Sequence, residues 1–331
     1  MSNEAAALTD VLTPAAPQPV TLGGRARKIA DAFLAGRTPP FDSEQLRAWL
    51  NACDWLVESG ELQAAKAALG TLDQHQPGLE WVTSMADLLE RAPPPSVDAP
   101  DLKDDLSRDV QIVSRPGADT ALILFCGAKH RVGMPLPLIH RWLARLGTSL
   151  IYVRDFHGLC YLNGIASLGS DRKATLEALR GILEDLGARR AICLGCSGGG
   201  FGAMLYALEL GGDTISLGSP TNMEPAFNQH MNYAAVVQEL KAAFPDEDLD
   251  LRRRIEAAAR PSRALIVYGD RNWNERIHAE HMAGLAGARL HPVTGYKGHA
   301  TAAELIRRGE FVPLLEGFIG GRAAGRDEPA R

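Results

Sequence analysis

The segment AICLGCSGGGFG, residues 191–202, is the most informative part of the sequence. An apolar run typical of a buried strand leads into Gly195, Ser197 and Gly199, which form the pattern G-x-S-x-G, and a helical pattern over residues 200–210 follows. A chain that turns this sharply from strand to helix needs residues without bulky side chains two positions before and after the serine. The turn would raise the Ser197 hydroxyl above a sheet and direct the Gly198 amide toward a developing oxyanion. The segment therefore predicts a nucleophilic serine.

A glycine-rich turn between strand and helix can also serve two different purposes. It can simply permit close packing, or it can bind a phosphate at the helix N-terminus. A nucleotide site fits less well, because no G-x-G-x-x-G opens the first strand of the domain and no P-loop lysine is present. Cys193 and Cys196 form C-x-x-C, but Cys193 lies within the predicted strand and Cys196 fills the variable position of the turn. Redox chemistry, or Cys196 as nucleophile, is therefore the weaker interpretation.

Strand and helix patterns alternate on both sides of this turn. The predicted strands are residues 109–114, 120–126, 149–153, 190–194, 214–217, 264–268 and 289–293. Helical patterns between most of them cover residues 136–146, 172–186, 200–210, 275–285 and 302–318. Residues 121–125 are apolar on both faces, as buried parallel strands are. The alternation predicts a doubly wound, mostly parallel α/β domain that binds its ligand at the carboxyl ends of the strands.

Two further side chains follow strand ends at places where a catalytic site would need them. Asp270 comes directly after one of the last strands, and His299 lies in the loop between the final strand and the last helix. Serine, acid and histidine thus occur in the order typical of a catalytic triad on this kind of sheet. Asp155 is a competing carboxylate, but it precedes the serine in the chain. We expect Ser197 as nucleophile, His299 as base and Asp270 as the acid that orients the histidine.

Residues 109–318 resemble the α/β-hydrolase superfamily. The matching motifs are the turn at residues 195–199, Tyr268-Gly269-Asp270 and Gly298-His299. The resemblance implies a serine hydrolase that cleaves a carboxylic ester through an acyl-enzyme, with a thioester or amide as alternative substrates and without a metal or organic cofactor. Acyl transfer on the same triad is a rival within the fold. A partner-binding scaffold is the rival from a different class.

The resemblance also implies an oxyanion hole and a lid. An oxyanion needs at least two donors, of which the Gly198 amide is one. The second is expected from the loop after residues 120–126, at Gly127 or Ala128. The lid, around residues 222–260, is short.

Several residues near strand ends are candidates for substrate binding. Lys129, His130 and Arg131 make a basic loop that could attract an anionic group, although a solvated loop accounts for it equally well. Tyr161 and Asn222 follow strand ends and are candidates to line a pocket.

His278, Glu280 and His281 suggest metal ligands at first sight. Their spacing without a further ligand nearby favours a helix surface instead, so no metal site is predicted.

The N-terminal part of the chain has a different pattern. We expect a mobile tail at residues 1–23, a helical segment at 24–95 and the catalytic domain at 96–331, with Pro93, Pro94 and Pro95 as the linker. The helical segment is similar to a tetratricopeptide unit, but a solenoid needs about three such units. A small helical extension is the preferred interpretation, with docking of a protein partner as the alternative.

The composition bears on which partners and which cellular location to expect. The chain has 331 residues, of which 46 % are hydrophobic and 23 % charged, with a net charge of −5, so a nucleic-acid or membrane-surface partner is not expected. Five cysteines do not form a disulfide framework, and the N-terminus lacks a secretory signal pattern. Together with the lack of a long apolar run, this predicts a soluble, cytoplasmic protein that acts on a small-molecule or acyl-carrying substrate.

Overall fold

The computed structural model describes residues 22–97, 100–127, 129–231, 233–244, 249–258 and 262–321. The described residues divide into two compact units: residues 22–107 with 134–145, and residues 108–133 with 146–321. Nearly all of the predicted tail and parts of the predicted lid lie outside the described residues. The domain boundary at residues 95–96 stays a prediction.

The first unit consists of helices and connecting segments. Its elements are α2 (Gly24–Leu34), the 3₁₀ turn η1 (Ser43–Gln45), α3 (Leu46–Glu58), α4 (Leu62–His75), α5 (Glu80–Arg91) and α6 (Leu136–Leu143). Successive helices from α2 to α5 contact one another, and α6 contacts α3. Trp49 and Leu56 of α3 are buried in this unit, on the apolar face of an amphipathic helix. The helical N-terminal part is confirmed.

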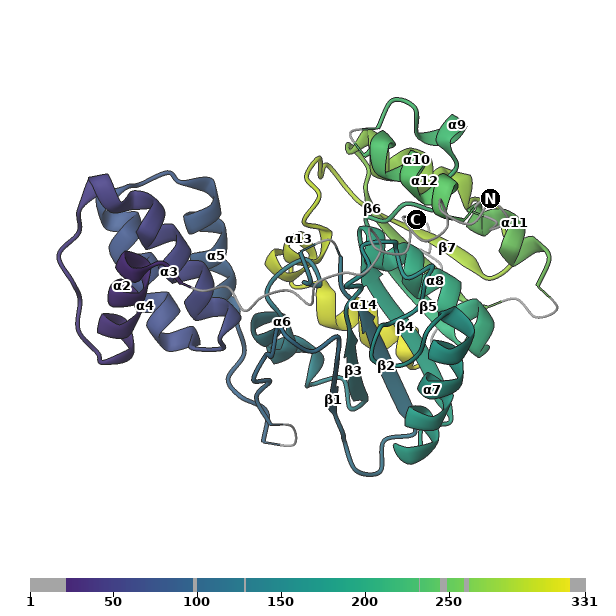
Figure 1. Cartoon of the computed structure of the whole chain (residues 1–331), viewed down its shortest axis with the longest axis horizontal. Coiled ribbons are helices and arrows are strands. Elements are labelled where there is room, and N and C mark those ends of the chain that lie inside the picture. The colour runs from purple at the N-terminus through teal and green to yellow at the C-terminus, as the bar shows by residue number, and fades with distance from the viewer. Residues whose placement is uncertain are drawn as a thin grey trace, which may run out of the picture. The chain divides into compact units, whose positions relative to one another are not determined.

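The second unit is built around one sheet of seven strands among the described residues (Figure 1). The strands are β1 (Val110–Val113), β2 (Thr120–Phe125), β3 (Ser149–Val153), β4 (Arg190–Cys196), β5 (Asp213–Leu217), β6 (Ala264–Gly269) and β7 (Ala288–Val293). Their order is β1-β3-β2-β4-β5-β6-β7, with β1 antiparallel to β3 and every other pair parallel. Together with the strand–serine–helix turn after β4, this order confirms the α/β-hydrolase fold.

Helices lie on both faces of this sheet (Figure 1). The helices of this unit are α7 (Arg172–Asp185), α8 (Gly198–Leu210), α9 (Pro225–Asn228), α10 (Ala234–Ala243), α11 (Leu251–Glu256), α12 (Trp273–His281), α13 (Thr301–Arg307) and α14 (Phe311–Ile319). The single helix predicted over residues 302–318 is two helices, because Gly309 adopts a left-handed φ of 71° and ends the first. No helix in the described part of the chain is long and apolar enough to span a membrane.

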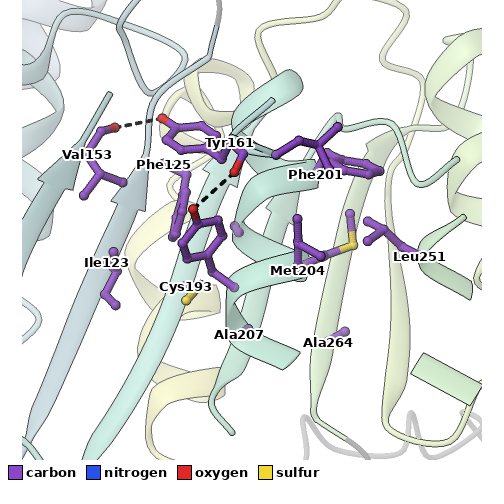
Figure 2. Close-up of a cluster of buried hydrophobic side chains, with 14 of the residues drawn as sticks. Ile123, Phe125, Val153, Tyr161, Cys193, Phe201, Met204, Ala207, Leu251 and Ala264 are labelled. Carbon is purple, nitrogen blue, oxygen red and sulfur yellow. Dashed lines mark hydrogen bonds between the residues drawn. The ribbon is translucent and has the colours of Figure 1, made fainter. Parts of the chain in front are cut away.

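An aromatic cluster packs the end of β2 against α8. Phe125 of β2 packs edge-on against Tyr161 with ring centroids 4.9 Å apart (Figure 2). The ring centroid of Tyr206 of α8 lies 5.2 Å from that of Phe125. All three side chains are buried. Since Phe125 is also the register partner of Gly195, the end of β2 lies directly beside the turn that carries Ser197.

Candidate active site

Ser197 occupies a strained turn between β4 and α8. Its φ of 52° and ψ of −133° lie in a region that side-chain-bearing residues rarely adopt, and it is the N-cap residue of α8. A Cβ on Gly195 would clash with the backbone of Gly199, and a Cβ on Gly199 would clash with the carbonyl of Phe125. Contact with backbone atoms thus requires glycine at both positions. At Gly195 the contact lies within the turn, as the sequence pattern predicts, whereas at Gly199 it is with the neighbouring strand β2.

A pocket of about 780 Å³ opens at the carboxyl ends of the strands. Ser197, Glu275 and His299 all line it, together with residues from the loops after β2, β3 and β5 and from the segment between β5 and β6. From that last segment, in which a lid is predicted, Met223, Tyr233 and Val236 contribute to the wall. The pocket therefore collects side chains that are far apart in the chain.

His299 is oriented by a glutamate. Its Nδ1 lies 2.8 Å from Oε1 of Glu275, and this hydrogen bond raises the pKa of His299. The glutamate side chain is 3 % exposed, whereas the histidine side chain is 60 % exposed. With its Nδ1 proton donated to Glu275, the neutral imidazole keeps an unprotonated Nε2, which can serve as a base.

Glu275 is held in place by the backbone around it. The amide of Gly269, the last residue of β6, donates to its Oε2 at 2.7 Å. Gly218, with a φ of +57°, lies so close that a Cβ there would come within 2.6 Å of Glu275 Oε1. Asn272 caps α12 by accepting from the Glu275 amide and donates through Nδ2 to the carbonyl of Gly298 at 3.0 Å. The start of α12 is thereby tied to the loop that carries His299.

Asp270 has different partners from those expected. Its Oδ1 accepts a hydrogen bond from the Gly295 amide at 2.7 Å, in the turn after β7. Glu275, and not Asp270, bonds to His299. The physical reason lies in α12, whose first turn directs Glu275 inward beneath the histidine. Sequence reasoning missed Glu275 because an Asn three residues before a Glu also fits a simple helix cap.

The expected oxyanion donors have different surroundings. The Gly198 amide is in the first turn of α8, where backbone N–H groups lack acceptors within the helix. Gly127 lies against the turn, since a Cβ there would be 3.1 Å from the Cys196 carbonyl oxygen, but its amide donates to the Arg131 carbonyl at 2.8 Å. In this structure the Gly127 amide is thus engaged within its own loop. Ala128 lies outside the described residues.

Only one residue of the predicted basic loop lies in the pocket wall. Among the described residues, His130 lines the pocket, whereas Lys129 and Arg131 do not. Burial, and then the charge of Arg154, lower the pKa of His130. A neutral imidazole in the wall does not provide the positive charge that the predicted basic loop would need to attract an anionic substrate group.

Tyr161 and Asn222 are both engaged in the fold. Tyr161 touches the pocket, but its hydroxyl lies 2.9 Å from the Val153 carbonyl (Figure 2) and from the Cys126 carbonyl. Asn222 accepts from the Glu224 amide at 2.7 Å and forms a backbone bridge with Asp250. Tyr161 therefore shapes the pocket wall through bonds within the protein, whereas Asn222, predicted to line the pocket, does not line it.

The helix-surface interpretation of His278 and His281 does not agree with the structure. His278 is 2 % exposed and lines the pocket, while His281 lies 2.8 Å from the Asp250 carboxylate. The segment between β5 and β6 covers this side of α12: Phe227 packs against both histidine rings. Sequence spacing alone could not reveal this cover.

The thiols near the serine are poor nucleophiles. Burial raises the pKa of Cys196 to about 11 and that of Cys160 to about 12, so both thiols are protonated near neutral pH. This agrees with serine, rather than cysteine, as the reactive group of the turn.

No protein-family model and no curated protein sequence matches the chain. Solved structures that resemble it include a CIB-like hydrolase from Thermoplasma acidophilum (15 % identity, TM-score 0.40, 64 % of this chain and 93 % of that chain). Proline iminopeptidase from Mycobacterium smegmatis is 15 % identical with a TM-score of 0.40, and the match covers 64 % of this chain and 94 % of that chain. Carboxyl esterase 2 from Tuber melanosporum is 13 % identical with a TM-score of 0.44, and the match covers 64 % of this chain and 80 % of that chain. These likenesses are weak, so the fold assignment rests on the sheet order and the serine turn.

Proposed function

We propose that the chain is a serine hydrolase that cleaves a carboxylic ester, with Ser197 as nucleophile, His299 as base and Glu275 as the orienting acid. The observation that carries the proposal is the 2.8 Å hydrogen bond between His299 and a buried glutamate, in the pocket that also holds the strained Ser197. A nucleophile, a base and a buried carboxylate on the base together form the constellation that activates a serine hydroxyl.

The reaction proceeds in two halves. His299 Nε2 accepts the proton of the Ser197 hydroxyl as the oxygen attacks the ester carbonyl, and Glu275 stabilises the imidazolium that forms. The Gly198 amide donates to the oxyanion of the tetrahedral intermediate. His299 then gives its proton to the departing alkoxide, which leaves an acyl ester on Ser197. Water, deprotonated by His299, hydrolyses this acyl-enzyme and restores the serine.

Hydrolysis is favoured over acyl transfer by the character of the pocket. His299 is 60 % exposed, so water can reach the base that must activate it. Polar side chains such as His130, Asp155 and Asn274 also line the wall. These polar side chains lie among apolar ones, so the access of water to His299, rather than the overall polarity of the wall, favours hydrolysis.

Labelling with a fluorophosphonate probe tests the proposal. We expect wild type and Asp270→Asn to be labelled on Ser197, Ser197→Ala to be unlabelled, and His299→Ala and Glu275→Gln to be labelled far more slowly. Mass spectrometry of the labelled peptide identifies the site. Circular dichroism of each variant controls for folding.

Two results would contradict the proposal. A folded wild type that neither reacts with the probe nor hydrolyses short nitrophenyl esters would leave the scaffold alternative, with the helical unit as the part to test for partner binding. Equal labelling of wild type and Glu275→Gln would remove Glu275 from the mechanism.

A further inference from the structure

One wall of the pocket contains a tyrosine bonded to a buried histidine. Tyr233, just before α10, and His278, in α12, both line the pocket, and the Tyr233 hydroxyl oxygen lies 2.7 Å from His278 Nε2. His278 is 2 % exposed. The proposed triad of Ser197, His299 and Glu275 uses neither residue.

The surroundings of His278 define which ring nitrogen carries its proton. The Thr221 amide donates to Nδ1 at 3.1 Å, so Nδ1 must be an acceptor. The Thr221 hydroxyl, which is 3.4 Å from the same nitrogen, donates its own proton to the His278 carbonyl at 2.8 Å. Burial lowers the pKa of His278 to about 3, so the ring is neutral. Its single proton is therefore on Nε2.

This tautomer determines the direction of the bond to the tyrosine. His278 Nε2–H donates to the Tyr233 oxygen, and the phenolic proton points elsewhere. Burial raises the pKa of Tyr233 to about 12, so the phenol keeps this proton near neutral pH. A fixed phenol with a proton to donate is a group that recognises an oxygen acceptor.

We infer that Tyr233, positioned by His278, donates a hydrogen bond to the substrate, and that the substrate is an ester carrying an additional carbonyl, ether or hydroxyl oxygen beyond its scissile group. The inference rests on the proposed hydrolase function. The side chains of His130 and His157 also line the pocket. The wall therefore offers a polar substrate more than one polar neighbour.

The tautomer can be tested without any substrate. In ¹⁵N NMR of the wild-type protein, we expect the His278 ring to show a proton on Nε2 only, and to stay neutral between about pH 5 and 8. Tyr233→Phe should shift the Nε2 resonance. A ring protonated on Nδ1, or one that titrates in this range, would overturn the inference whether or not the protein is a hydrolase.

Selectivity of hydrolysis tests the contact with substrate. The substrates are a hydrocarbon ester and its oxa analogues, in which an ether oxygen replaces one methylene at successive positions of the acyl or alcohol chain. We expect wild type to favour at least one oxa ester, and Tyr233→Phe to lose roughly 10-fold in kcat/KM on that ester while changing by less than about 2-fold on the hydrocarbon. Tyr268→Phe is the matched control, since Tyr268 does not line the pocket.

Variants of His278 separate positioning from packing. His278→Gln retains an N–H donor for the Tyr233 oxygen and should keep most of the preference for the oxa ester, with KM raised less than in His278→Ala. Equal losses on both ester types in Tyr233→Phe would overturn the inference. Fluorophosphonate labelling of Ser197 in wild type and Tyr233→Phe reports on the hydrolase function separately, because the probe reacts with an activated serine whether or not Tyr233 donates to a substrate.

Discussion

Asp270 and Glu275 are two carboxylates that follow β6 closely, yet they have different environments. Asp270 is half-buried and accepts a hydrogen bond from the Gly295 amide in a turn. Glu275 is 4 % exposed and holds both the Gly269 amide and the ring of His299. The first stabilises a loop, and the second bonds to the proposed base.

The difference shows what a catalytic carboxylate requires. An ion pair or charged hydrogen bond is weak when water surrounds it and stronger when water is excluded. Burial of Glu275 leaves its charge to be balanced by the groups that touch it, and His299 is one of these. Asp270 lies at the open end of a strand, where water can reach its carboxylate, so its charge does not depend on a contact with the histidine.

The largest expected effect is on the rate of the chemical step. Glu275→Gln should lower kcat by roughly 10⁴-fold, because the neutral amide cannot stabilise the histidine cation and, by donating its NH₂ to Nδ1, favours the wrong tautomer. Asp270→Asn should change kcat by less than about 3-fold, because its side chain can still accept from Gly295. Steady-state kinetics on a nitrophenyl ester measures both. The reverse order of effects would restore Asp270 as the acid.

An intermediate effect is expected from crowding the glutamate. Gly218→Ala places a Cβ within 2.6 Å of Glu275 Oε1 and should lower kcat by roughly 100-fold, as misplacement of a catalytic group by about 1 Å does. Gly211→Ala is the matched control. Gly211 has a similar φ of +68°, so it suffers the same backbone strain, but it has open space around its Cα. If both variants lose activity equally, strain rather than the glutamate is responsible.

The smallest effect concerns pH. The bond to Glu275 raises the pKa of His299 above its ordinary value of about 6.5, and only the neutral ring can accept a proton from Ser197. The acidic limb of kcat/KM should therefore have its midpoint above about pH 6.5. Glu275→Gln removes the carboxylate charge that favours the protonated ring, so NMR titration of His299 should give a lower pKa in this variant. An unchanged pKa would show that the contact does not control the base.

Much of the fold follows from local pattern. The both-sided apolar strands and the intervening helices predict a parallel sheet, and the structure has β2 to β7 in that arrangement. The prediction of one helix over residues 302–318 is wrong, because Gly309 divides it. A left-handed glycine inside a run of good helix formers is hard to distinguish from a tolerated one by sequence alone.

The site could be predicted only in part. Ser197 and His299 line one pocket, and both follow from their places after strands. Glu275 lies in the first turn of a helix, where a capping pattern already explains a glutamate. Nothing further in the sequence indicates that its side chain points into the pocket. Tyr233 and His278 come from segments whose contact depends on how the chain between β5 and β6 packs over α12.

The sequence by itself determined the serine turn. Its glycines are two positions from Ser197: a Cβ on Gly195 would clash within the turn, with Gly199, and a Cβ on Gly199 would clash with Phe125 at the end of the neighbouring strand β2. The G-x-S-x-G pattern records both requirements, although it does not show the second contact. Only the tertiary structure decided which carboxylate meets His299 and which wall of the pocket carries a proton donor. Both features depend on burial and on contacts between segments that are far apart in the chain. The periodicity of apolar residues predicts that a side chain is buried, but it does not predict which residues contact it.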